Sequence, residues 1–263
     1  MKFLTLAAEV LLMANAALAS PLAARKQAVR DSIRARHSIR RSNRFVGSTN
    51  KVNGTADVAS GNWAGAAIST SGVTEVTGTF TVPKPTVPSG GSSSTEYCGA
   101  AWVGIDGYTD DDLIQTGVLW CIEDGEYLYE AWYEYLPASL VEYSGISVTA
   151  GSVVTVTATK TGTNSGVTTL TSGGTTVTHT FTGQSYSLPG TSAEWIVEDF
   201  LSGGSEVPFA DFGSVTFTGA SAIVSGATVT PGGDGAVNIY LEENGKVLTS
   251  TTISGSTVTV DYE

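Results

Sequence analysis

Two stretches of the sequence concentrate side chains that can do chemistry. The first runs from Cys98 to Cys121 and holds an indole, a carboxylate and an amide in Trp102, Asp106 and Gln115. Cys98 and Cys121 are the only cysteines of the chain, and paired cysteines in a secreted protein form a disulfide. We therefore expect a Cys98–Cys121 bond that encloses Gln115, with two free buried thiols as the alternative.

The second stretch, residues 193–200, reads Ala-Glu-Trp-Ile-Val-Glu-Asp-Phe. Alternate residues of an extended strand point to the same side, so Glu194, Ile196 and Glu198 would share one face. A carboxyl group among large apolar side chains has a raised pKa, as proton-transferring groups often do. The pattern makes Glu198 a candidate for proton transfer, and an exposed acidic strand face is the plain alternative.

The remaining residue types limit the chemistry. The chain has two histidines, and the one outside the N-terminal region, His179, falls in a run of Thr and Val typical of a strand. Zinc sites built on paired histidines and the His-Glu-x-x-His motif are therefore ruled out, and a Ser-His-Asp triad would depend on His179. Carboxylate chemistry assisted by amides, Tyr and Trp remains, with no metal or cofactor expected.

The elements that must position these residues are short strands. Segments 153–159, 167–170 and 175–181 are built mostly of Val and Thr, and Gly, Ser, Asn and Pro separate such segments along the chain. Val and Thr favour half-buried pleated surfaces. Asn244-Gly245, between segments 236–242 and 246–252, is a strong signal for a tight hairpin. The sequence predicts one all-β domain, an antiparallel sandwich or barrel.

The N-terminal region differs from this body. Residues 1–19 have the charged start, the apolar run and the Ala17-Leu18-Ala19 site of a secretory signal peptide. Residues 20–54 contain nine of the 13 Lys and Arg and one acid, Asp31, which indicates a basic propeptide. We place the propeptide at 20–57, with Asn53-Gly54-Thr55 as a glycosylation sequon, and the mature domain at 58–263.

The charge of the mature body excludes some partners. From Thr55 onward there are three basic residues, all Lys, and 23 acids, and the net charge of the chain is −12. Such a body repels nucleic acid and anionic lipid, and the mature sequence has no apolar run of membrane-spanning length. We expect a secreted monomer that binds neither, and a basic propeptide that docks on the acidic body as its inhibitor.

Five motifs together closely resemble the glutamic peptidases, the eqolisin family. They are Asn62-Trp63-Ala64-Gly65, Trp102-Val103-Gly104-Ile105-Asp106-Gly107, Ile114-Gln115-Thr116-Gly117, Ala131-Trp132-Tyr133-Glu134 and Glu194-Trp195-Ile196-Val197-Glu198-Asp199-Phe200. The resemblance covers about 58–263. It implies a secreted acid endopeptidase, made as a zymogen, on a lectin-like β-sandwich (jelly-roll-like) of two curved antiparallel sheets. Such a peptidase takes protein and peptide substrates.

The resemblance also implies the site. Its catalytic dyad matches Gln115 and Glu198, not Glu194. Its substrate-cleft residues match Trp63, Gly65, Trp102, Asp106, Trp132 and Phe200. Where some members carry Asp and Tyr this chain has Leu119 and Leu136, and its 106–115 loop is one residue shorter than in some members. These departures leave the dyad intact and bear on subsite preference and on the support of Gln115.

The side chains of this dyad suggest a mechanism and leave three rival functions open. Glu198 as a carboxylate can take a proton from water, while the Gln115 amide stabilises the oxyanion. A glycoside hydrolase or lectin would instead use Glu134 with Glu198 as a carboxylate pair. A serine-carboxyl peptidase would use Ser192. A non-enzymatic structural protein is the third alternative.

Overall fold

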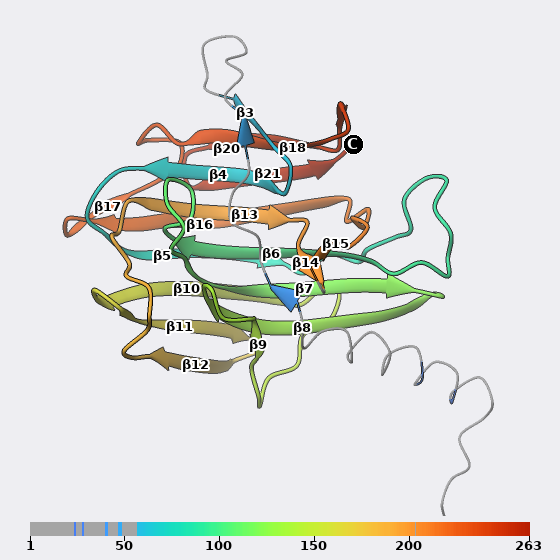
Figure 1. Cartoon of the computed structure of the whole chain (residues 1–263), viewed down its shortest axis with the longest axis horizontal. Coiled ribbons are helices and arrows are strands. Elements are labelled where there is room, and N and C mark those ends of the chain that lie inside the picture. Colours follow the sequence, from blue (N-terminus) through green and yellow to red (C-terminus); the bar gives the residue numbers. More distant parts are fainter. Residues whose placement is uncertain (1–23, 25–27, 29–39, 42–46, 49–56, 203) are drawn as a thin grey trace, which may run out of the picture.

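The computed structural model describes residues 24, 28, 40–41, 47–48, 57–202 and 204–263 (Figure 1). The predicted signal peptide, the glycosylation sequon and nearly all of the predicted propeptide lie outside these residues. No helix in the described part of the chain is both long and apolar enough to cross a membrane. The described chain is built almost entirely of strands.

One layer is an eight-stranded sheet, in the order β12-β11-β10-β5-β16-β21-β20 with β17 paired to β16. Its strands are β5 (Val73–Thr81), β10 (Val153–Gly162), β11 (Ser165–Ser172), β12 (Thr175–Phe181), β16 (Ser214–Val224), β17 (Ala227–Val229), β20 (Thr249–Ser254) and β21 (Thr257–Tyr262). In β10, Val154, Val156 and Ala158 are buried while Thr155 is exposed. This period-two alternation is what a strand with one solvent-facing side requires.

The second layer is a ten-stranded sheet, in the order β2-β3-β18-β4-β13-β6-β7-β8-β9 with β19 paired to β18. Its strands are β2 (Gly47–Ser48), β3 (Asp57–Ser60), β4 (Trp63–Ser69), β6 (Tyr97–Ile105), β7 (Ile114–Glu123), β8 (Glu126–Tyr135), β9 (Val141–Glu142), β13 (Ser192–Glu198), β18 (Val237–Glu243) and β19 (Lys246–Val247). Every residue of β13 is buried, and so are almost all of β6 and β7. Both faces of this sheet are therefore covered.

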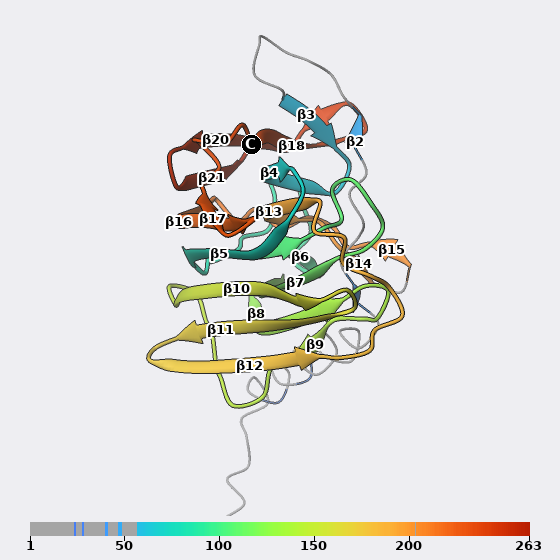
Figure 2. The same ribbon diagram turned by 90° about the vertical axis from the view of Figure 1, so that its left-hand side faces the viewer.

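The two sheets stack on each other, and a small sheet lies outside them. Figure 2 shows the eight-stranded sheet on one side and the ten-stranded sheet on the other. The small sheet has the order β1-β14-β15, formed by β1 (Arg40–Arg41), β14 (Leu201–Ser202) and β15 (Ser205–Glu206). The predicted antiparallel sandwich is confirmed, and the barrel alternative is wrong. One pair, β3 with β18, is parallel.

Two apolar clusters flank the ten-stranded sheet. The inner cluster fills the space between the sheets and includes Trp120 and Trp195. The outer cluster covers the other face and includes Ile196. Trp195 and Ile196 are neighbours on β13, so the predicted alternation of this strand is confirmed. We call the side of the ten-stranded sheet that carries Ile196 its outer face.

The local predictions also hold. Segments 153–159, 167–170 and 175–181 lie within β10, β11 and β12. Asn244 and Gly245 both have positive φ, of 52° and 78°, and join β18 to β19. Two positive φ values in succession are what the two-residue turn of a tight hairpin needs.

Candidate active site

The register of four neighbouring strands sets the positions on the outer face. Across β13, β6, β7 and β8 it aligns three rows: Glu194–Gly104–Gln115–Glu134, Ile196–Trp102–Gly117–Trp132 and Glu198–Ala100–Leu119–Glu130. The first and third rows hold the carboxyl and amide groups, and the middle row holds two tryptophans. Gln115 and Glu198 therefore lie on one face, two strands and two rows apart.

Two glycines on this face are required by close approach of the chain. A Cβ atom on Gly117 would lie 2.1 Å from the Ala101 carbonyl oxygen, and one on Gly65 would lie 2.1 Å from the Trp195 carbonyl oxygen. Gly65 also has a φ of 139°, which L side chains rarely adopt. Gly65, which the family resemblance assigns to the substrate cleft, is needed for the packing of β4 on β13.

Glu198 is fixed by the tryptophan in the neighbouring row. The Trp102 indole Nε1 donates a hydrogen bond of 2.7 Å to Glu198 Oε2. Trp63, which faces Glu198 across the β4–β13 pair, packs edge-on against Trp102 with ring centroids 4.9 Å apart. All three side chains are fully buried. This hydrogen bond limits the rotamers of the Glu198 side chain.

Gln115 is held by a residue that the sequence did not assign to it. Its Nε2 donates a 2.7 Å hydrogen bond to Oε2 of Glu134, its register partner on β8. Gln115 Oε1 is buried and accepts no hydrogen bond from any described residue. The Trp132 indole Nε1 is also buried and donates no hydrogen bond to any described residue. A buried acceptor and a buried donor left open in this way are places for a water or a ligand.

Glu194 occupies the row of Gln115 but is separated from it. A Cβ on Gly104, which lies between them, would be 2.9 Å from both Leu113 Cδ1 and Trp102 Cζ3. These two side chains therefore cover the space over Gly104. Burial raises the pKa of Glu194 well above its ordinary value.

Asp106 is buried and bound to the main chain. Its carboxylate accepts hydrogen bonds from the backbone N–H of Gly190 (2.9 Å) and Thr191 (2.6 Å), and from the Thr191 hydroxyl (3.1 Å). Its φ of 71° marks a sharp reversal at the end of β6. Asp106, which the resemblance assigns to the cleft, therefore anchors residues 190–191 through these hydrogen bonds.

The remaining predicted cleft residues lie together. Trp63, Trp102, Trp132 and Phe200 belong to the outer cluster, and so do Leu119 and Leu136, the two departures from the family pattern. The cleft that the resemblance implies is thus lined by large apolar side chains. Leu119 lies between Ala100 and Glu130 in the row of Glu198.

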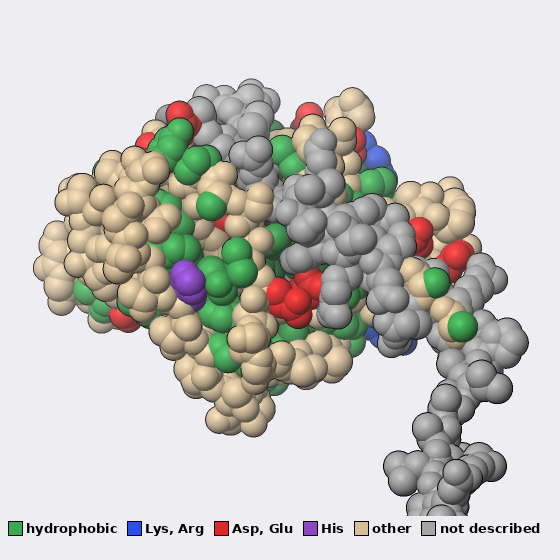
Figure 3. Space-filling view, turned by 60° about the horizontal axis from the view of Figure 1, so that its bottom comes forward, with side chains coloured by type: hydrophobic (Ala, Val, Ile, Leu, Met, Phe, Trp, Pro, Cys, Tyr) green, Lys and Arg blue, Asp and Glu red, His purple; other side chains and the backbone are tan. Residues whose placement is uncertain are grey.

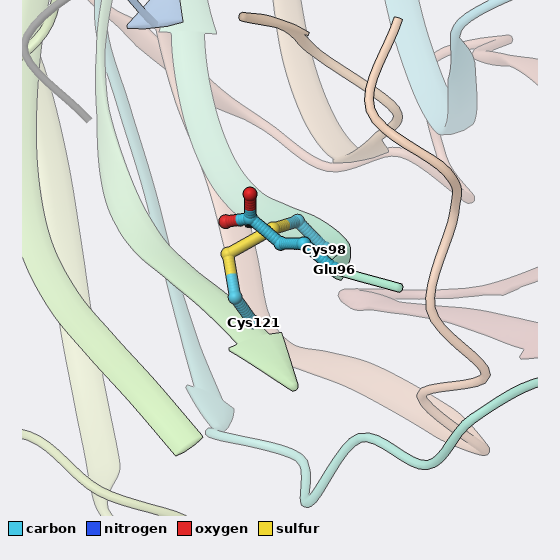
Figure 4. The surroundings of a disulfide bond; sticks show 3 residues. All are labelled: Glu96, Cys98 and Cys121. Atoms are coloured by element: carbon cyan, nitrogen blue, oxygen red, sulfur yellow. Dashed lines mark hydrogen bonds between the residues drawn. A yellow bond between two sulfur atoms is a disulfide. The ribbon is translucent and has the colours of Figure 1, made fainter. Parts of the chain in front are cut away.

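The predicted disulfide is confirmed. Cys98 and Cys121 form a disulfide bond (Figure 4), and they are register partners on β6 and β7. Strand β7 also carries Gln115. Glu96 brings a carboxylate oxygen within 4.8 Å of both sulfurs. Because the two sulfurs are bonded to each other, they do not offer thiolate ligands.

Other hydrolytic mechanisms would depend on His179 or Ser192. Neither side chain has the surroundings that such a mechanism needs. His179 stacks on Tyr133, with ring centroids 3.9 Å apart and an interplanar angle of 10°, on strand β12 of the opposite sheet. The Ser192 hydroxyl is buried and has no hydrogen-bond partner among the described residues. A nucleophilic serine needs a base within hydrogen-bond reach.

The comparisons with known proteins agree with this arrangement. A family model described as the Peptidase A4 family matches residues 61–262. The chain belongs to the peptidase A4 family. Its relatives in the family include Aspergillopepsin-2 of Aspergillus niger, 44% identical over 95% of this chain and 96% of the relative. Scytalidopepsin B of Scytalidium lignicola is 35% identical over 81% of this chain and 82% of its own length.

Solved structures of glutamic peptidases share the fold. Scytalido-glutamic peptidase bound to a transition-state-analogue inhibitor superimposes with a TM-score of 0.69 at 36% identity, over 77% of this chain and 98% of that one. Aspergilloglutamic peptidase from Aspergillus niger gives 0.61 at 48% identity, over 64% and 99%. The predicted family is confirmed, and the chain is a peptide hydrolase of the glutamic type.

Proposed function

We propose that this A4-family chain is a secreted acid endopeptidase that hydrolyses peptide bonds with Gln115 and Glu198, and that it is made as a zymogen. The observation that carries the dyad is the pair of buried contacts on one face. Trp102 holds Glu198, and Glu134 holds one N–H of Gln115. Gln115 Oε1 is left as an open acceptor.

The first half of the reaction uses Glu198 as a base. The carboxylate takes a proton from a water molecule while the water oxygen forms a bond to the peptide carbonyl carbon. An amide nitrogen carries two N–H groups, so the Gln115 Nε2 that serves Glu134 retains one for the developing oxyanion. The open Gln115 Oε1 is an acceptor for the other proton of that water.

In the second half Glu198 acts as an acid. The protonated carboxyl gives its proton to the amide nitrogen as the C–N bond breaks, which releases an amine and a carboxylic acid and restores the carboxylate. One carboxyl group thus serves as base and then as acid, and the neutral amide stabilises charge. Among the described residues, the assignment favours Glu198 over Glu194 because Leu113 and Trp102 lie between Glu194 and Gln115.

The charge of the mature body supports the proposed acidic working range. Figure 3 shows a face on which acidic side chains gather and basic ones are few. Burial, followed by the neighbouring Glu206 and Glu243, raises the pKa of Asp199 well above its ordinary value. Mutual repulsion among such carboxyl groups weakens as they take up protons, so the fold is favoured by acid.

The zymogen proposal rests on two strand pairs. β1 of the predicted propeptide pairs with β14, and Leu201 of that pair directly follows Phe200 of the catalytic motif. β2 pairs with β3, which ends three residues before Trp63. Both pairs flank the register pair of Glu198 and Trp63. A basic segment tied at these two points would block the cleft until it is removed.

The test is hydrolysis of a denatured protein by the processed enzyme at acidic pH, with and without pepstatin. We expect peptide-bond cleavage that pepstatin leaves unchanged, since the paired Asp-Thr/Ser-Gly motifs of pepsin-like proteases are absent from the sequence. Adding the isolated 20–57 segment should inhibit more strongly at low salt and near neutral pH. Absence of cleavage at every acidic pH would overturn the proposal.

The residues that the rival functions would need are not placed for those roles. A glycoside hydrolase would need Glu134 as a catalytic carboxyl, but one of its oxygens accepts the Gln115 amide. A serine-carboxyl peptidase would need a base at Ser192, whose hydroxyl has no described partner. Hydrolysis of a polysaccharide that survives Gln115→Ala, or loss of proteolysis in Ser192→Ala, would favour these alternatives.

A further inference from the structure

Glu194 is a buried acid that the proposed mechanism does not use. Its side chain is fully buried on β13, and neither carboxylate oxygen has a hydrogen-bond partner among the described residues. The neighbouring Ser192 hydroxyl lies close enough to favour the ionised form but outside hydrogen-bonding geometry. An unpaired buried carboxylate is very costly, whereas a neutral carboxyl group is tolerated.

The groups next to Glu194 form a latch between two loops. Asp106 accepts hydrogen bonds from the N–H groups of Gly190 and Thr191. The Thr191 hydroxyl bridges Asp106 and Asp110, and Asp110 also accepts the N–H groups of Gly107 and Asp112. We call Asp106, Asp110, Gly190 and Thr191 the Asp106 latch. It ties the 106–113 turn to the segment that leads into β13.

Three acids, Glu194, Asp106 and Asp110, thus interact electrostatically. Asp106 and Asp110 are the charged groups that act on Glu194, and Glu194 in turn acts on Tyr108 in the same turn. On the β4 side Glu194 faces Ala67, and on the β6 side it faces Gly104, neither of which can titrate. The described cations are not among the groups that act on Glu194. Ionised Glu194 would therefore meet these two neighbouring acids with only the Ser192 hydroxyl to offset them.

We propose that Glu194 is the proton-dependent element that keeps the Asp106 latch closed, so that the protein is stable with this side chain neutral and loosens when it ionises. The 106–113 turn leads directly into β7, whose second residue is Gln115. Opening the latch would free the turn that positions the catalytic amide. Neutralising the medium would thus inactivate the enzyme through its fold, independently of how Glu198 titrates.

The sign of the effect follows from linkage. The pKa of Glu194 is raised on folding, first by burial and then by Asp106 and Asp110. Such a group contributes stability below its unfolded pKa, and this stability is lost as the pH rises through the window up to the folded pKa. The change therefore makes the folded state weaker at neutral pH than in acid.

The test compares the melting temperature of the full chain with that of Glu194→Gln from pH 4 to pH 7. We expect the wild-type melting temperature to fall with pH and the variant to fall much less, because the amide cannot ionise. Glu75→Gln is the matched control, since it removes one charge from a carboxyl that is only partly buried on β5. It should keep the wild-type slope. Unfolding is measured, so the outcome does not depend on the proposed peptidase activity.

A local measurement separates the latch from general destabilisation. The amide protons of Gly190 and Thr191 should lose hydrogen-exchange protection between pH 4 and pH 7 in the wild type and retain it in Glu194→Gln. Equal pH slopes for Glu194→Gln and the wild type would overturn the proposal. If Glu194→Gln does not fold, Glu194→Met provides the second neutral side chain. Failure of both to fold at pH 4 would also overturn it, because a neutral side chain would then not be the stable form.

Discussion

The outer faces of the two sheets treat polar side chains in opposite ways. On the eight-stranded sheet the register aligns two rows of hydroxyl groups across five strands: Thr178–Thr169–Thr157–Thr77–Ser221 and Thr176–Thr171–Thr155–Thr79–Thr218. Many of these groups bond to each other across strands, as Thr77 does to Thr157 and Thr79 to Thr155, each at 2.8 Å. On the ten-stranded sheet the equivalent positions hold buried carboxyl groups, an amide and tryptophans.

The difference shows which sheet of this sandwich carries the buried ionisable groups. Paired hydroxyl groups are neutral at every physiological pH, so their face is equally stable throughout. In the ten-stranded sheet burial raises the pKa of Glu194, and this makes the sheet sensitive to pH. Function and pH sensitivity should therefore both reside in the ten-stranded sheet, and substitutions in the two sheets can test this.

The largest expected effect belongs to Glu198. Glu198→Gln keeps the shape of the side chain but cannot accept or return the proton, so turnover should fall by about 10³- to 10⁴-fold while the fold is retained. Rates on a denatured protein at acidic pH, with circular dichroism as the folding check, measure this. Glu194→Gln is the matched control on the same strand and should stay active. A dead Glu194→Gln beside an active Glu198→Gln would reverse the assignment of the base.

The next effect belongs to Gln115. Gln115→Ala removes the proposed oxyanion donor and should lower kcat by about 10²- to 10³-fold, with a small change in KM. Glu134→Gln, which disturbs the partner of Gln115 and leaves the amide itself, should cost less. The same substrate and pH serve for both variants. Wild-type turnover in Gln115→Ala would show that the amide is not needed.

The disulfide should affect stability. Cys98 and Cys121 are separated by 23 residues, so replacing both by Ser should cost about 3 kcal/mol of unfolding free energy in the loop-entropy model. Chemical denaturation at pH 4 measures this. Because β7 carries Gln115, activity should decline at a lower temperature in parallel. A variant as stable as the wild type would mean that the β6–β7 ladder alone holds the strands.

The smallest effect is expected on the hydroxyl face. Thr157→Val replaces one partner of the Thr77 hydrogen bond by a side chain of similar shape and should change stability by about 0.5 kcal/mol. The change should be the same at pH 4 and pH 7, as measured by thermal unfolding at both. A strong dependence on pH would contradict the division between the two sheets.

Local patterns predicted much of the fold. Alternating Val and Thr located β10, β11 and β12, Asn244-Gly245 located a hairpin, and the alternation of β13 separated Ile196 from Trp195. These features depend on neighbours within a few residues, which the sequence displays directly. The family motifs added the strands that carry the site, and they named Gln115, Glu198 and the tryptophans around them.

The sequence did not predict which polar groups meet. Glu134 became the partner of Gln115 through the register of β7 with β8, and that register is fixed by side-chain packing along both strands. The Asp106 latch joins segments more than 80 residues apart. The buried, unpaired state of Glu194 depends on Leu113 and Trp102 covering the space beside it. Each of these contacts exists only after long-range pairing is complete.

The parallel pair of β3 with β18 has a consequence for biosynthesis. Val58 pairs with Ile239, about 180 residues later in the chain, and β4, which carries Trp63, also pairs with β18. During synthesis this edge of the ten-stranded sheet stays without its neighbour until nearly the whole polypeptide has emerged. Truncated products of interrupted translation should therefore lack a working site, and the cell would be exposed to little peptidase activity before the chain is finished.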